Sequence, residues 1–376
     1  MAKNISMRSF SGKFNGLDHL RAVAILLVLT FHYRMFGHPD WVDTYGGLGW
    51  TGVDLFFVLS GFLISNKLFS EIKKQNTINL KVFFAKRLFR IIPPYLLTVL
   101  LYFCFPVIRE KEALPPLWKF ITFTQNYGLN LFDQGTFSHA WSLCIEEQFY
   151  LLIPFSLLLL IKTKTFRYIR YIILILIVIS ISARYITWQK DIVPLIPTDN
   201  YWKEWYMKIY YPTYTRLDGL AMGVLTGYLF QYSAWFKKFI ASKGNLLFIV
   251  GIIMLGFSFW FCSDQVSPHA STWGFTLVAL SYTLLVMAAI SESCFLYRTK
   301  LFATSQLASL SYALYLSHKF VIHIIQNILK QMQIQVASNV TLIICLTACI
   351  ITALIYRYTV ENISAKIKNK LIHIKN

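Results

Sequence analysis

Ten long apolar segments recur along the chain, and they constrain its fold more than any other feature. An α-helix needs about 20 mostly apolar residues to cross the hydrocarbon core of a bilayer. The segments lie near residues 17–36, 52–69, 91–108, 141–161, 168–188, 214–231, 245–262, 272–290, 307–329 and 338–357. Because a helix satisfies its own backbone hydrogen bonds in lipid, this pattern predicts an all-α, polytopic membrane protein with about ten transmembrane helices.

The composition agrees with a surface that faces lipid. Of the 376 residues, 56% are hydrophobic and only 14% are charged, whereas soluble domains average about 25% charged residues. The net charge of +19 would suit a nucleic-acid-binding protein, but the basic residues form short clusters between the apolar segments. Such clusters are typical of loops at a membrane face, so we expect membrane lipid and no nucleic acid as a partner.

Cysteine usage indicates packing rather than chemistry. Six cysteines lie inside or at the ends of apolar segments, with no CxxC pair among them: Cys104, Cys144, Cys262, Cys294, Cys345 and Cys349. We interpret them as small apolar residues, and we expect neither disulfides nor a metal site.

Lysine and arginine are dense in every second loop. The basic loops and tails contain Lys3, Arg8 and Lys13; Lys73, Lys74, Lys81, Lys86, Arg87 and Arg90; Lys162, Lys164 and Arg167; Lys237, Lys238 and Lys243; Arg298 and Lys300; and Lys366, Lys368, Lys370 and Lys375. Residues 37–51 and 263–271 contain no lysine or arginine, and residues 109–140 balance theirs with acids. Because basic loops stay in the cytosol, we expect both termini inside, in the inner or plasma membrane of the cell.

The chain shows no internal repeat or linker, which predicts a single membrane domain over residues 1–376. Its core covers about residues 14–358, and residues 359–376 form a basic cytosolic tail. The first apolar segment contains Asp18, His19 and Arg21 and lacks a small-x-small cleavage site. We therefore expect a retained first helix rather than a cleaved signal peptide.

Several ionisable residues lie where lipid would exclude them, so each is a candidate for function. Arg21 and His32 are eleven residues apart, which is nearly three helical turns, so they share one helix face about 16 Å apart along the axis. Asp18 lies one turn before Arg21 on that face. Simpler interpretations remain open: Arg21 as a basic flank of the helix and His32 as an interfacial residue.

The predicted topology sorts the other polar residues into two groups. The outer group contains His32, Asp54, Glu146, Glu147, Arg216 and Asp218, and it offers acid–base chemistry. The cytosolic group contains Arg21, Lys86, Arg87 and Arg90, and it offers anion binding. His318 falls near the middle of the ninth segment, and Ser60 with Gly61 is expected to let helices pack closely. Asp54 could instead be a simple helix N-terminal acid, and the basic cluster a membrane anchor.

Six fragments together resemble the membrane acyltransferase family 3, whose members are O-acyltransferases that modify cell-surface glycans and related molecules. They are, in order, GLDHLRAVAILLVLTFH, GVDLFFVLSGFLI, FFAKRLFRIIPPY, WSLCIEEQFYLLIP, RLDGLAMG and SYALYLSHKF. The resemblance covers essentially the whole chain. Some members carry a fused extracytoplasmic esterase-like domain, and we expect none here.

The resemblance implies roles for individual residues. His32 and Arg21 match an essential His and Arg of the first helix, Arg87 and Arg90 match an Arg-x-x-Arg loop, and Glu146 matches a conserved acid. The implied donor is acetyl-CoA or another acyl-CoA, bound by Arg21, Lys86, Arg87 and Arg90. Arginine forks suit its phosphates. Asp54, Glu147, Arg216 and Asp218 are the candidates for binding a glycan or glycolipid acceptor.

A mechanism follows as a hypothesis. His32 would deprotonate an acceptor hydroxyl, with Glu146 orienting its imidazole, and the alkoxide would attack the thioester. An acyl-His intermediate is the alternative route.

A transporter or flippase for a lipid-linked saccharide is the alternative function, since it would also need many spans and buried charges. Aromatic residues of the outer loops would stack on sugars or form an interfacial belt: Trp41, Tyr45, Trp50, Tyr201, Trp202, Trp205 and Tyr206. The oligomeric state and the identity of the acceptor are not predicted.

Overall fold

The computed structural model describes residues 14–373, and the described residues form helices and loops without a β-strand. The α-helices are α1 (Asn15–Tyr33), α2 (Trp41–Gly46), α3 (Thr51–Gln75), α4 (Leu80–Cys104), α5 (Leu117–Ile121), α6 (Trp141–Lys162), α7 (Ile169–Thr187), α8 (Tyr201–Trp205), α9 (Leu217–Tyr232), α10 (Ala234–Phe261), α11 (Phe275–Ala289), α12 (Phe295–Arg298), α13 (Phe302–Gln331), α14 (Asn339–Tyr356) and α15 (Asn362–His373). Each of the ten predicted segments overlaps one long helix, so the all-α prediction is confirmed for these residues.

Seven helical stretches are long and apolar enough to cross a membrane. They are Trp41–Gln75, Leu80–Cys104, Ser138–Lys162, Phe166–Leu195, Ala234–Phe261, Ala270–Ala289 and Asn339–Leu371. Of the other three predicted segments, α9 has only 16 residues, and the polar residues on α1 and α13 lower their hydropathy. The protein is therefore a helical membrane protein. The count of ten spans and the cytosolic position of both termini remain predictions.

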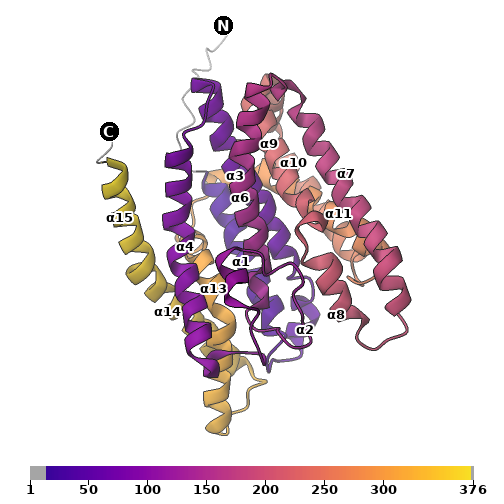
Figure 1. Ribbon diagram of the computed structural model, residues 1–376, viewed down its shortest axis with the longest axis vertical. Helices are drawn as coiled ribbons and strands as arrows, with labels where there is room; N and C mark the ends of the chain where they lie inside the picture. The colour runs from indigo at the N-terminus through magenta and orange to yellow at the C-terminus, as the bar shows by residue number, and fades with distance from the viewer. Residues whose placement is uncertain (1–13, 374–376) are drawn as a thin grey trace.

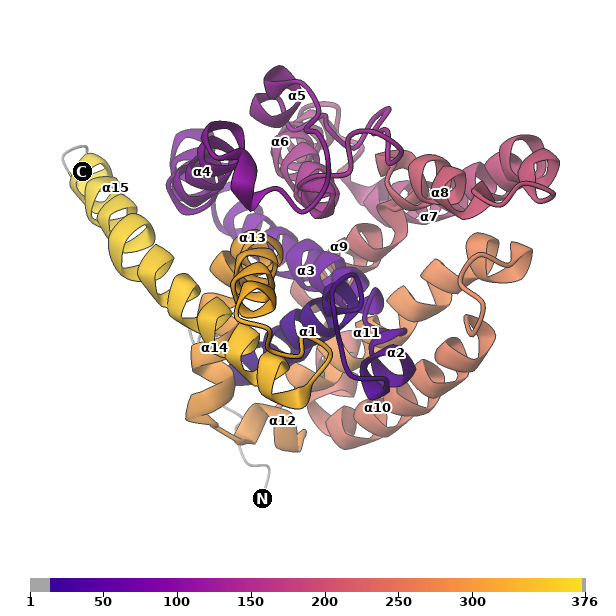
Figure 2. The same cartoon turned by 90° about the horizontal axis from the view of Figure 1, so that it is seen from below.

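Helices α1 and α3 lie in the middle of the bundle, with α4 and α6 on one side and α10 on the other (Figures 1 and 2). Helix α3 packs closely on α9 through two glycines. A Cβ atom on Gly61 would lie 2.3 Å from the Leu220 carbonyl oxygen, and one on Gly223 would lie 2.3 Å from the Val58 carbonyl oxygen. Only glycine permits this approach, which confirms the predicted packing role of Gly61.

Apolar side chains cover the outside of the bundle as well as its core. On α7 and α10, for example, Val178 and Ile253 are 58% and 65% exposed, as expected of surfaces that face lipid tails. Five cysteines are buried and free, and Cys104 is free and exposed.

The predicted basic tail is helical in its described part. A short π-helical segment, η9 (Arg357–Glu361), leads from α14 into α15, and α15 packs against α4 at the edge of the bundle (Figure 1). Four residues of the predicted basic tails lie outside the described range, namely Lys3, Arg8, Lys13 and Lys375.

Candidate active site

Three histidines from distant parts of the chain meet in the interior. His32 lies near the end of α1, His318 lies in the middle of α13, and His139 lies in η2 (Ser138–Ala140), just before α6. The Nδ1 atom of His32 is 2.8 Å from the Nε2 atom of His318, and their rings are stacked with centroids 4.9 Å apart. The His139 ring lies edge-on to both, 5.5 Å from His32 and 5.0 Å from His318. All three side chains are buried.

His32 and His139 face a narrow space that we call the histidine chamber. Its other walls include Trp50, Ser138, Trp141, Tyr206, Tyr210, Tyr211 and Lys319. The free volume is only about 30 Å³, which accommodates about one water molecule. A reaction in this chamber would therefore proceed with almost no bulk water.

Lys319 brings a positive charge to the wall of the chamber. Its ammonium group is 3.0 Å from the Glu110 carboxylate, and both side chains are only 3% exposed. Glu110 also accepts a hydrogen bond from the backbone N–H of Phe137, which fixes the loop that carries His139. The ion pair thus holds three parts of the site together, namely the loop at Glu110, η2 and α13.

A second space, which we call the Arg cavity, lies between α1, α3, α4, α6 and α13. It has a volume of about 330 Å³, and its charged lining residues are Arg21, Lys67, Arg87, Arg90, Glu146 and Glu147. Arg87 and Arg90 are three residues apart on α4, so the prediction that they share a helix face is confirmed. Neither of them forms an ion pair within the described part of the chain, whereas Arg21 lies 4.0 Å from Asp18.

The Arg cavity adjoins a largely basic vestibule of about 380 Å³ between α4, α13 and the C-terminal helix. Lys67, Arg87 and Arg90 belong to both spaces, and the vestibule adds the basic residues Lys86, Arg357 and Lys368 and one acid, Glu361. Each of the four residues predicted to bind the donor therefore lines at least one of these two adjoining spaces. The sequence did not point to Lys67, Arg357 or the α15 residue Lys368 as part of it.

We had expected Glu146 and Glu147 to belong to the outer polar group, but both line the Arg cavity instead. The first turn of α6 is buried, with Trp141 3% exposed and Cys144 and Ile145 0% exposed, so α6 begins inside the protein. The two glutamates, one turn further on, therefore reach the Arg cavity.

The expected contact between Glu146 and His32 is also absent from the described structure. Glu146 accepts hydrogen bonds from Ser60 at 3.1 Å and from Tyr150 at 2.7 Å, and His32 pairs with His318 instead. Ser60 is thus a hydrogen-bond donor as well as a small packing residue. The idea that Glu146 orients the His32 imidazole was wrong, because α6 carries Glu146 into the other space.

A set of hydrogen bonds separates the two spaces. The Tyr315 hydroxyl is 2.7 Å from the Ser142 hydroxyl and 2.5 Å from the carbonyl oxygen of His139. Tyr315 and Ser142 line the Arg cavity, and His139 lines the histidine chamber. Arg21 and His32, which share a face of α1, therefore open onto different sides of this partition.

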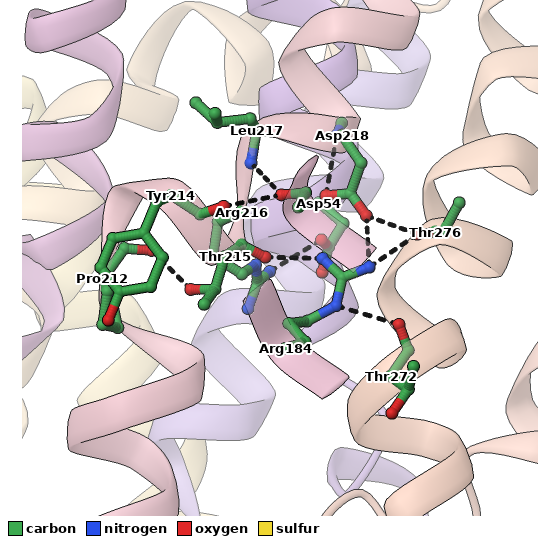
Figure 3. Close-up of polar contacts among 12 residues, drawn as sticks. Asp54, Arg184, Pro212, Tyr214, Thr215, Arg216, Leu217, Asp218, Thr272 and Thr276 are labelled. Carbon is green, nitrogen blue, oxygen red and sulfur yellow. Dashed lines mark hydrogen bonds and ion pairs between the residues drawn. The ribbon is translucent and has the colours of Figure 1, made fainter. Parts of the chain in front are cut away.

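A buried network of charges surrounds the start of α9 (Figure 3). Arg216 is 2.7 Å from Asp54, and Arg184 is 3.0 Å from Asp218. Arg184 also donates hydrogen bonds to the Thr272 and Thr215 carbonyl oxygens and to the Thr276 hydroxyl. All four charged side chains are at most 2% exposed.

This network contains three of the residues predicted to bind an acceptor, namely Asp54, Arg216 and Asp218. None of them lines the histidine chamber or the Arg cavity. Arg216 stacks on aromatic rings, 4.1 Å from the Phe275 centroid and 4.6 Å from that of Tyr210, and Tyr210 is a wall of the chamber. Their binding role remains a prediction. In the structure Arg216 packs against a wall of the chamber, and Asp54 pairs with Arg216.

Among the outer aromatic residues, Trp50 and Trp205 are buried, at 2% and 0% exposure. Trp205 packs in the core, whereas Trp50 is one of the walls of the histidine chamber. Trp41, Tyr45 and Trp202 are exposed, at 43%, 74% and 44%.

Sequence reasoning missed five residues of the site: Glu110, His139, Arg184, Tyr315 and Lys319. Arg184 lies inside the predicted fifth segment, where an ionisable residue is itself a signal. Lys319 and Tyr315 stand beside His318 in one of the fragments that carry the family resemblance. The described residues contain no cluster of His, Cys, Asp or Glu able to hold a metal ion.

The fold and the site together define a helical membrane protein with a buried histidine cluster beside an arginine-lined cavity. The sequence model of a protein family described as an acyltransferase domain matches residues 14–357, so the chain belongs to this acyltransferase family. The resemblance seen in the sequence is therefore confirmed.

Two relatives show how far the similarity extends. The chain is 28% identical over 363 residues to the O-acetyltransferase OatA of Staphylococcus aureus strain NCTC 8325 / PS 47, which covers 91% of this chain and 56% of the relative. It is 29% identical over 355 residues to a putative O-acetyltransferase of Staphylococcus aureus strain COL, which covers 85% of this chain and 52% of the relative. The chain thus spans about half the length of the curated relatives it matches. No solved structure matches it.

Proposed function

We propose that this protein is a membrane O-acetyltransferase that moves an acetyl group from cytosolic acetyl-CoA to a hydroxyl of an extracytoplasmic or lipid-linked glycan. The observation that carries the proposal is the placement of His32. A histidine base faces a nearly dry chamber on one side of the Tyr315 partition, and an arginine-lined cavity opens on the other. Family membership and the names of the relatives support acyl transfer to oxygen.

The basic vestibule fits the charged head of an acyl-CoA. That head carries a 3′-phosphate and a diphosphate, and arginine forks bind phosphate oxygens through paired hydrogen bonds. Arg87 and Arg90 form no ion pair within the described structure, so their donors remain available to a ligand. The adjoining Arg cavity, with Arg21 at its wall, would take the uncharged arm that ends in the thioester.

The chemical step would use His32 as a general base. The Nε2 atom takes the proton from the acceptor hydroxyl, and the oxygen attacks the thioester carbonyl carbon. The new C–O bond forms as the C–S bond breaks. The leaving CoA thiolate takes up the proton from Nε2, giving an ester, free CoA and the starting histidine.

The Lys319 ammonium group, although paired with Glu110, lies at the wall of the chamber in which the negative oxygen of this step develops, and its N–H groups are hydrogen-bond donors. Fixed charges in a site without bulk water act strongly on such an oxyanion. The transfer also requires the contact of Tyr315 with Ser142 and His139 to open, because it separates the thioester from His32.

Membrane vesicles of known orientation test this function. Radiolabelled acetyl-CoA is added to inside-out vesicles that contain the protein and the endogenous envelope glycans, and label is measured in the glycan fraction. We expect labelling with the native protein, none with His32→Ala, and none in intact right-side-out vesicles, where the donor cannot reach the cytosolic face. A transporter or flippase would give no thioester-dependent labelling, and that result would overturn the proposal.

A further inference from the structure

We infer that His318 is a positioning residue, which holds His32 in the tautomer with its proton on Nδ1 and so leaves Nε2 as the basic atom. The inference rests on the chain of hydrogen bonds around the two rings. It goes beyond the proposed function because it assigns a tautomer to the base and a role to a second histidine.

The proton positions follow from the partners of His318. Its Nδ1 atom lies 2.9 Å from two carbonyl oxygens of its own helix, those of Leu314 and Tyr315. A carbonyl oxygen only accepts hydrogen bonds, so the Nδ1 atom of His318 must carry a proton. In neutral His318 the Nε2 atom is then an acceptor with a free lone pair.

The same reasoning fixes His32. Its Nδ1 atom is 2.8 Å from the Nε2 atom of His318, so His32 Nδ1 must be the donor in this hydrogen bond. The reverse arrangement would place the lone pair of His318 Nδ1 against two carbonyl oxygens. A doubly protonated His318 would put a second positive charge beside Lys319 in a buried site, which is costly.

The catalytic consequence lies at the other nitrogen of His32. Neutral imidazole has one protonated and one unprotonated nitrogen, so fixing the proton on Nδ1 leaves the lone pair on Nε2. His32 lines the chamber, and Nε2 makes no hydrogen bond within the described residues. Nε2 is therefore free for the acceptor hydroxyl.

His318 also supports the charged form of His32 during the reaction. When Nε2 takes a proton, the hydrogen bond from Nδ1 to His318 becomes charge-assisted and therefore stronger. An aspartate usually fills this position in triads of this kind. Here the partner is a neutral histidine, itself held by the backbone of α13.

The tautomer is testable without any enzymatic activity. Full-length protein labelled with nitrogen-15 in histidine is reconstituted in lipid, and solid-state NMR distinguishes protonated from unprotonated ring nitrogens. The signals of His32 are assigned by their loss in His32→Gln. We expect the proton on Nδ1 in the native protein, retained in His318→Gln, whose side-chain oxygen still accepts, and lost in His318→Leu. A proton on Nε2 in the native protein, or an unchanged spectrum in His318→Leu, would overturn the inference.

A kinetic arm, which rests on the proposed function, measures acetyl transfer from acetyl-CoA in inside-out vesicles. We expect His318→Leu to lower kcat roughly 10- to 100-fold while the KM for acetyl-CoA stays unchanged, with partial rescue in His318→Gln. His323→Leu is the matched control, because His323 lies on the same helix and contacts Asn327 outside the chamber. Equal losses in His318→Gln and His318→Leu would contradict the positioning role. A native protein with the expected tautomer but no transfer would overturn the proposed function alone.

Discussion

Arginines occupy two very different environments in this protein. In the network at the start of α9, Arg184 and Arg216 each lie within 3.0 Å of an aspartate and are 0% exposed. In the Arg cavity and its vestibule, Arg87 and Arg90 are partly exposed and have no carboxylate within ion-pair distance among the described residues.

The difference separates charges that are paired inside the protein from charges that remain available to a ligand. The charge of a buried arginine is neutralised by its aspartate. Removing one partner leaves the other charge buried and uncompensated in surroundings of low dielectric constant. A cavity arginine without a partner carries an unneutralised charge that favours an anion. Residue type alone does not distinguish these cases, because both sets stand near the ends of apolar helices.

The largest effect is expected when the network is broken. Arg184→Met should lower the free energy of unfolding by about 3–5 kcal/mol, because Asp218 loses its buried partner. Denaturant titration of the purified protein in detergent measures this, with Arg87→Met as the matched control that should stay close to the native value. Similar destabilisation in both variants would remove the distinction between the two environments.

Changing a cavity arginine should affect the donor instead of the fold. Arg87→Lys keeps the charge but loses the fork, so the KM for acetyl-CoA should rise roughly 10-fold while the unfolding midpoint stays the same. Initial rates at varied acetyl-CoA concentration provide the measurement. An unchanged KM would favour the simpler interpretation of this cluster as a membrane anchor.

The partition between the two spaces gives a smaller effect. Tyr315→Phe removes the hydroxyl that contacts Ser142 and the His139 carbonyl, and it should cost about 1 kcal/mol of stability. Because the closed arrangement is weakened, hydrolysis of acetyl-CoA in the absence of an acceptor should increase. Release of free CoA, followed with a thiol reagent, reports this, and a reduced release would contradict a separating role for Tyr315.

The smallest effect is expected in the C-terminal helix. Lys368 lines the vestibule as a single charge on a partly exposed residue, so Lys368→Ala should raise the KM for acetyl-CoA only about two- to threefold, and less at high salt. Lys370→Ala is the control on the exposed side of α15. Equal changes in both variants would indicate a general charge effect rather than contact with the donor.

The sequence was sufficient for the helices and for the shared face of Arg87 and Arg90, because both depend on local spacing. Apolar segments place ten helices, and Arg87 and Arg90 share a face because they are three residues apart. The pairing of His32 with His318 joins residues 286 positions apart, and no spacing rule reveals such a contact. Glu146 was assigned to the wrong space for the same reason, since the depth at which α6 begins depends on the packing of the loop before it.

The central claim is that His32 performs the transfer, and the envelope glycans report on it most directly. Glycans from cells with the native protein and from cells with His32→Ala are compared by mass spectrometry, with equal amounts of inserted protein verified in both. The account predicts an acetyl-sized mass increment on a glycan from the native cells and its loss in the variant. The same increment in the His32→Ala cells would contradict the account.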